Sequence, residues 1–299
     1  MYLTPAQYRA RNYAVDVSSW SDAQLAAQLN RSASAIHAYT AAPTLPTPHD
    51  FRGGSIVGET HTWRISDYEP VTRRVFLFHR PVKAVSTLRI YATDSQYVEF
   101  AADEIYYEAA EGWIEPASAN LTSYGLFGAA VIPFVGLSQP HVYASYTYGR
   151  RIPIEEQIYP IGGNTWLASI GAWSSDVGDE PVIAVGGVVR PDTDYTIDYR
   201  SGQVTFVVNE PASAATVVAQ FYTGLHPDIA EAEGLITTGA IADRSYVATL
   251  GGLRRLTVAE ITIERATDRA GGGAAQPVTI SEEAAALLDP FIFRSVAFA

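Results

Sequence analysis

The sequence contains no cysteine and few charged residues, which make up 17% of its 299 residues. Without cysteine the chain forms no disulfide, thiolate metal site or cysteine nucleophile, and its redox compartment is left open. The 20 Lys and Arg against 32 Asp and Glu give a net charge of −12, which argues against a protein that coats nucleic acid, because such binding needs clustered cations. The longest apolar run, 125–137, is interrupted by Pro133 and is too short for a membrane helix, and no signal-peptide core is found near residue 1. We therefore expect no membrane segment.

What the chain does contain is typical of turn-rich β-structure: 18 Tyr, 23 Gly and 17 Pro within a 47% hydrophobic composition. From about 51 to 224, apolar and polar residues alternate with a period of two between turn residues. Between two of these segments, Gly202 supplies the positive φ that a hairpin turn needs. The alternation predicts strands at 75–78, 88–91, 97–100, 195–199 and 204–208.

One sequence pattern occurs twice in this region. The first copy begins at Pro81 and ends in VYASYTYG at 142–149, and the second begins at Pro181 and ends in VVAQFYTG at 217–224. The first copy is longer before its last strand, and the extra residues include the apolar run 125–137. Such a run either tucks beneath its own domain or contacts a partner, and the sequence favours neither. The candidate contact residues are Phe127, Val131, Ile132 and Phe134.

The two ends of the chain favour helices. Thr4 before Pro5 predicts a helix over about 5–12, and Ser21 with Gln24 forms a capping box before an Ala-rich helix that ends before Pro43. Towards the other end, the pattern predicts a helix over 229–250, a strand over 256–264 and a short helix that begins at Ser281. Gly234 and Gly239 weaken the prediction of the helix over 229–250.

We therefore predict an α+β fold. Its helical part comprises 1–45 and 225–299, and a mainly antiparallel β insertion occupies 50–224, with two related β-units at about 75–150 and 178–224.

No residue set for catalysis is found. GxSxG, P-loop and GxGxxG motifs are absent, and the six histidines show no spacing of metal ligands. Asp192, Asp194 and Asp198 alternate as in a calcium loop but lack its glycine and terminal glutamate, so we favour turn and strand-entry roles for them. We predict a protein that is not an enzyme and that binds no cofactor and no metal.

The order of several short motifs resembles the tailed-phage head-to-tail connector family. These motifs are YLT before the Ala-rich helix, the strands ending YTYG and FYTG, HPDI at a helix start, and the final ISEEAAALLDPF. The resemblance implies an adaptor protomer of a homo-oligomeric, dodecameric ring between the portal protein and the stopper or tail proteins. It also implies assembly in the host cytoplasm, a place in the virion neck, and passage of viral DNA without sequence-specific binding. The chain departs from the family in its long, duplicated β-part.

Two alternatives remain open on the sequence. One is a phage tail or baseplate component, since the second copy also looks like modules of phage tail proteins. The other is a carbohydrate-binding β-module that contacts the host surface.

Two further segments are candidate protein contacts. Arg150 and Arg151 directly follow the YTYG strand and either lie on a solvated surface or anchor an acidic neighbouring subunit. The apolar segment 289–299 carries Phe291, Ile292, Phe293 and Phe298, and we expect it to dock on a neighbouring protomer or on the portal.

Overall fold

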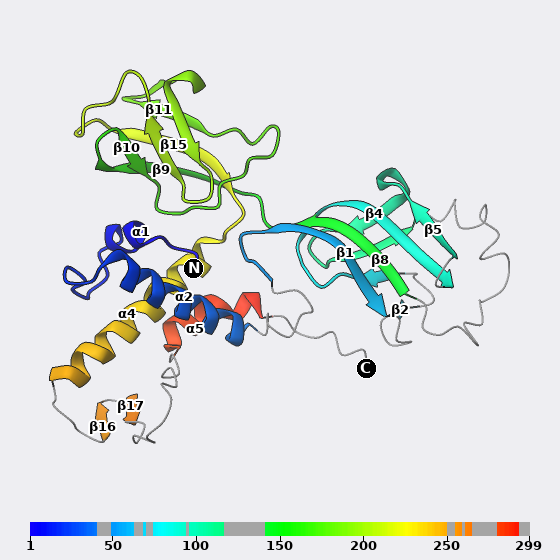
Figure 1. Ribbon diagram of the computed structural model, residues 1–299, viewed down its shortest axis with the longest axis horizontal. Coiled ribbons are helices and arrows are strands. Elements are labelled where there is room, and N and C mark those ends of the chain that lie inside the picture. Colours follow the sequence, from blue (N-terminus) through cyan, green and yellow to red (C-terminus); the bar gives the residue numbers. More distant parts are fainter. Residues whose placement is uncertain are drawn as a thin grey trace. The chain divides into compact units, whose positions relative to one another are not determined.

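The computed structural model describes residues 1–40, 49–62, 68–69, 74–93, 96–116, 141–249, 255–258, 261–264 and 280–292 (Figure 1). Within these residues the fold is α+β, as predicted, with helices near both chain ends and antiparallel sheets between them. The helices are α1 (Pro5–Ala10), α2 (Asp22–Tyr39), α4 (Pro227–Thr249) and α5 (Glu282–Leu288).

The chain divides into two compact units. The major unit contains the described residues of Met1–Thr44 and Pro153–Arg294, and the minor unit contains those of Leu45–Ile152. The second β-copy therefore belongs with the helices, whereas the alternation in the sequence groups both copies in one insertion. The physical reason is a set of hydrogen bonds from the N-terminal segment to this copy, which alternation along the chain does not reveal.

The minor unit consists of two four-stranded antiparallel sheets. The strand orders are β1-β8-β4-β5 and β2-β3-β7-β6. The core is built by alternate residues, such as Val142, Ala144, Tyr146 and Tyr148 along one strand, none of which is more than 4% exposed, so the predicted period-two burial is confirmed. The strands are β1 (Gly54–Thr62), β2 (Tyr68–Glu69), β3 (Arg74–Phe76), β4 (Val82–Thr93), β5 (Gln96–Phe100), β6 (Ile105–Glu108), β7 (Trp113–Pro116) and β8 (His141–Tyr148).

The second β-copy, in the major unit, forms a seven-stranded sheet in the order β12-β11-β15-β9-β10-β14-β13. Its core includes Ile158, Ile183 and Val204 with 0% exposure. The strands are β9 (Ile152–Gly162), β10 (Thr165–Leu167), β11 (Val182–Val185), β12 (Val188–Val189), β13 (Tyr195–Asp198), β14 (Gln203–Phe206) and β15 (Val217–Thr223).

The two copies share one strand arrangement. The order β5-β4-β8-β1 in the minor unit corresponds to β12-β11-β15-β9 in the major unit, and β6-β7-β3 corresponds to β13-β14-β10. The turns correspond too: Gly112 and Gly202 both have positive φ, and their N–H groups donate to Glu108 and Asp198 at 2.9 Å. The duplication therefore begins upstream of the repeated sequence, because β1 and β3 have counterparts in β9 and β10.

The helical part is organised around α4, which contacts both α2 and α5. Capping side chains begin the helices where the sequence predicts: Thr4 before α1, Ser21 before α2 and Ser281 before α5. Gly234, which weakened the prediction of α4, has a packing role, because a Cβ atom there would lie 1.9 Å from the hydroxyl of Tyr13. The close approach of Tyr13 explains a glycine inside this helix.

The prediction of a single strand over 256–264 is wrong. The segment forms an antiparallel hairpin of β16 (Arg255–Val258) and β17 (Ile261–Glu264). Alternation continues in both arms of a hairpin, so periodicity alone does not locate so short a connection.

Candidate functional site

The predicted contact residues have different positions in the structure. Phe127, Val131, Ile132 and Phe134 lie outside the described residues, as do Phe293 and Phe298. Arg150 and Arg151 are exposed and connect β8 to β9.

Phe291 is mostly buried against its own chain. It is 9% exposed, and its ring meets that of His226 edge-on with the centroids 5.1 Å apart. Ile292, which follows it, is half-buried. Little of the Phe291 ring is therefore accessible to a partner, so the predicted docking of segment 289–299 depends on residues after it.

The aspartates that alternate near β13 serve the local turns. The carboxylate of Asp192 accepts a hydrogen bond from Tyr195 at 3.0 Å, and that of Asp198 accepts one from Ser201 at 2.6 Å. The carboxylate of Asp194 accepts a hydrogen bond from the amide of Asn209 at 3.2 Å. Each of the three carboxylates therefore has its own partner, which agrees with the turn and strand-entry roles that the sequence favoured.

A buried polar cluster lies in the minor unit. His49 and His79 are stacked with their Nδ1 atoms 3.0 Å apart, and His79 also stacks on Tyr148. Close by, the buried carboxylate of Glu59 accepts hydrogen bonds from the hydroxyl of Tyr146 and from the N–H of Phe78. The sequence does not reveal this cluster, because its histidines are separated by thirty positions.

Protonation of His79 conflicts with this geometry. The residue is 0% exposed, and among the described residues its Nε2 has no hydrogen-bond partner. If Nδ1 donates to His49, an added proton goes to Nε2, for which the described residues offer no acceptor. If Nδ1 accepts, an added proton breaks the bond to His49. Burial accordingly lowers the pKa of His79 and outweighs the opposite influence of the Glu59 carboxylate.

We expect the minor unit to lose stability as the pH falls below 6.5, the ordinary pKa of histidine. There the unfolded chain binds a proton that the folded chain does not, so stability falls by up to about 1.4 kcal/mol per pH unit until the lowered folded pKa is reached. Free energies of opening from amide hydrogen exchange in β4 and β8, at pH 7.5 and 5.0, measure this loss.

In the His79→Phe variant the pH dependence should shrink, whatever the variant does to stability at neutral pH. The matched variant His226→Gln, in the major unit, should leave the dependence in β4 and β8 unchanged. An unaltered pH dependence in His79→Phe contradicts the assignment.

A second buried carboxylate holds the N-terminal residues on α4. Glu233 is 0% exposed and accepts hydrogen bonds from the backbone N–H of Tyr2, at 2.8 and 2.9 Å, and of Leu3, at 2.5 Å. The N-terminal residues are thus part of the helical core rather than an unattached end.

The N-terminal segment also holds α4 to the second β-copy. The amide of Gln7 donates to the carbonyls of Ala168 and Ser201 at 3.1 and 2.9 Å. Arg11 pairs with Glu231 of α4 at 2.6 Å and donates to the carbonyl of Ser169 at 3.0 Å. These bonds explain why the second copy forms one compact unit with the helices.

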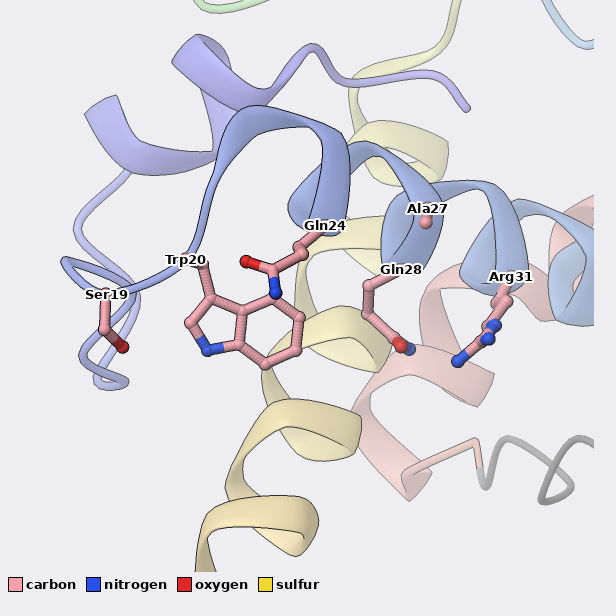
Figure 2. Close-up of a pocket in the computed structure, with 6 residues that line it drawn as sticks. All are labelled: Ser19, Trp20, Gln24, Ala27, Gln28 and Arg31. Atoms are coloured by element: carbon pink, nitrogen blue, oxygen red, sulfur yellow. The ribbon is translucent and has the colours of Figure 1, made fainter.

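A cavity of about 480 Å³ lies beside α2 (Figure 2). Spacings of three and four residues place its helical lining residues on one side of α2. Gln28 is 2% exposed, and neither atom of its side-chain amide has a hydrogen-bond partner among the residues that the structure describes. The cavity is lined by Ser19, Trp20, Gln24, Ala27, Gln28 and Arg31.

The sequence alone does not predict this cavity, although it contains one relevant signal. Gln28 falls within the buried stripe of α2, next to Leu25 and Leu29. A glutamine among residues that face a helical core must find partners for its amide, and the described part of the chain provides none.

Comparison with known proteins does not assign the chain to a family. No protein-family model matches the chain, and no curated protein matches it significantly. Across the described residues, no group of three or more His, Asp or Glu side chains is arranged to hold a metal ion. None of the helices in the described ranges has both the length and the apolar character needed to cross a membrane.

Proposed function

We propose that the protein is a structural adaptor of a tailed-phage particle, a head-to-tail connector protomer without catalytic activity. The observation that carries the proposal is that both chain ends pack into one helical part. Glu233 of α4 binds the backbone of Tyr2 and Leu3, and the hydroxyl of Tyr39 in α2 donates to Asp289, next to α5, at 2.7 Å. Three of the motifs that resemble the connector family, YLT, HPDI and ISEEAAALLDPF, belong to this helical part, and the strands ending YTYG and FYTG lie in the two β-copies.

In this proposal the protomers form a closed, dodecameric ring in the virion neck. A ring requires head-to-tail interfaces, so each protomer offers two different surfaces to its neighbours. The portal protein lies on one side, the stopper or tail proteins lie on the other, and viral DNA passes through. The net charge of −12 suits such a channel, because it disfavours adhesion of the phosphate backbone.

Electron microscopy of assembled particles tests the proposal. Twelvefold density beneath the portal that fits both described units supports it, and its loss in particles assembled without this protein identifies the density. Failure to find the chain in that ring contradicts it.

A second candidate, a tail or baseplate component, is favoured by the duplicated β-arrangement. Threefold or sixfold density for this chain at the tail supports that role instead.

A further inference from the structure

The second β-copy exposes aliphatic side chains on the outer face of its sheet. Val182 of β11 and Val189 of β12 are 39% and 62% exposed, whereas Ile183, on the opposite face, is 0% exposed. Val189 lies opposite Ala184, two positions along β11 from Val182, so the two valines are diagonal neighbours on one face. Ala184 in turn lies opposite the half-buried Val218 of β15. We call these four residues, Val182, Ala184, Val189 and Val218, the valine face.

The first β-copy carries a different row of side chains at the equivalent positions. Its last strand, VYASYTYG, corresponds to VVAQFYTG of the second copy, so Tyr143 takes the place of Val218. Tyr143 lies opposite Arg89, and Arg89 lies opposite Glu99. This is the same cross-strand row that the valine face forms in the second copy.

The first copy shows that the fold does not need valines here. The Nε atom of Arg89 donates to the carboxylate of Glu99 at 2.7 Å, and its guanidinium lies 5.3 Å from the ring centroid of Tyr143. Thr87, which corresponds to Val182 in the strand register, is polar as well. Single exposed valines are ordinary, but neighbouring ones on adjacent strands, at positions where polar residues suffice, indicate an interaction surface.

The valine face contains no polar side chain and therefore fits an uncharged, apolar occupant. The longest apolar run of the chain, 125–137, has this character, since it contains no charged residue. It lies outside the described residues, in the connection 117–140 between β7 and β8. The equivalent connection of the second copy, 207–216, is much shorter. The first copy thus has an apolar segment that the second lacks, and the second copy has an apolar face that the first lacks.

We propose that the valine face binds segment 125–137 of a second copy of the chain. The inference rests on the proposed ring and deepens it, because a closed ring needs two unlike surfaces on each protomer, here the segment and the face. The equivalent face of the segment's own unit is a poor match, since it carries Arg89 and Glu99. Interfaces between identical subunits are also more apolar than other protein interfaces.

Cysteine cross-linking between full chains tests the inference, because the chain contains no cysteine of its own. Tagged Val189→Cys chains are mixed with untagged Val131→Cys chains at about 1 mM, where even a weak contact is populated, and oxidised mildly. A disulfide requires Cα atoms within about 7 Å, so its formation reports direct contact. We expect at least about fivefold more of the mixed pair than with Val57→Cys in place of Val189→Cys, because contact raises the effective thiol concentration. Val57 is 83% exposed, so chance collisions would favour this control instead.

A charge variant provides a second readout. Val189→Asp, introduced into Val182→Cys chains, should lower their cross-linking to Val131→Cys chains about tenfold, because it places a carboxylate in an apolar contact. Val57→Asp, introduced into the same Val182→Cys chains, changes the net charge equally and should leave the yield unchanged. Both valines are exposed, so neither substitution disturbs the core.

Three results overturn the inference. The first is an equal yield from the Val189→Cys and Val57→Cys mixtures. The second is an intramolecular disulfide in the double variant Val131→Cys/Val189→Cys at high dilution, which assigns the segment to its own chain. The third is a higher yield when Val296→Cys replaces Val131→Cys, which assigns the face to segment 289–299. A ring seen by microscopy without the cross-link contradicts this inference alone, whereas the cross-link without a ring in the neck contradicts the proposed function alone.

Discussion

Replacement of Glu233 by alanine is expected to destabilise the major unit by about 3 kcal/mol and to release the N-terminal residues from α4. The carboxylate is fully buried and binds the N–H groups of Tyr2 and Leu3. Alanine leaves these donors without their charged acceptor, and hydrogen bonds to charged groups are among the strongest in proteins. Urea unfolding of the major unit measures the loss, and hydrogen exchange of residues 2–10 reports the release.

Glu231→Ala is the matched control for this variant. Its carboxylate lies two positions away in α4, pairs with Arg11 and is 40% exposed, so its loss should amount to about 1 kcal/mol or less. Glu233→Gln, which keeps one acceptor oxygen, should fall between the two alanine variants. Equal losses in Glu233→Ala and Glu231→Ala, or unchanged exchange of residues 2–10, contradict a role of Glu233 as an anchor.

Gly202→Ala is expected to destabilise the second β-copy by about 3 kcal/mol. The residue has φ +70°, and a Cβ atom would lie 2.6 Å from the carbonyl oxygen of Ile170 and 2.8 Å from Nε1 of Trp173. That Nε1 donates to the same carbonyl at 2.9 Å, so the new methyl group would separate an existing hydrogen bond in addition to straining the turn.

Gly186→Ala separates these two effects. Gly186 lies in the same unit with φ +58°, but nothing stands within 4 Å of a Cβ atom there. Its substitution should therefore show the backbone strain alone, about 1 kcal/mol. Urea unfolding of both variants gives the difference, and equal losses would show that the contact with Ile170 and Trp173 is unimportant.

Local signals predicted much of this fold. The caps at Thr4, Ser21 and Ser281 are confirmed, as is the hairpin turn at Gly202, because capping and turn geometry depend on residues close in the sequence. The repeated strands are also confirmed as related elements. The strand pairing that the two copies share depends on alternating apolar residues and a glycine at the turn, and both features can be recognised in the sequence.

Contacts between distant segments were not predictable in this way. Gln7 and Arg11 join the second copy to α4, yet nothing near them in the sequence names Ala168, Ser169 or Glu231 as partners. Such pairings follow from the packing of whole elements, which a single sequence does not specify.

The candidate site shows the same limit. The exposure of Arg150 and Arg151 could be expected from the sequence, because charged side chains usually lie at the surface. The sequence did not reveal the cavity lined by Trp20, Gln28 and Arg31, because a cavity is defined by what the surrounding helices leave unfilled. The glutamine in the buried stripe of α2 was the one signal available.

The duplication offers a natural comparison within one chain. Tyr146 of the first copy corresponds to Phe221 of the second. In the first copy Tyr146 donates a hydrogen bond to the buried Glu59, whereas in the second copy Trp173 stacks on Phe221 with the ring centroids 4.0 Å apart. Both copies experience the same solvent, temperature and chain length in every experiment. A difference in their response to acid that His79→Phe removes therefore reports the interior side chains around His79, with the shared strand arrangement serving as an internal reference.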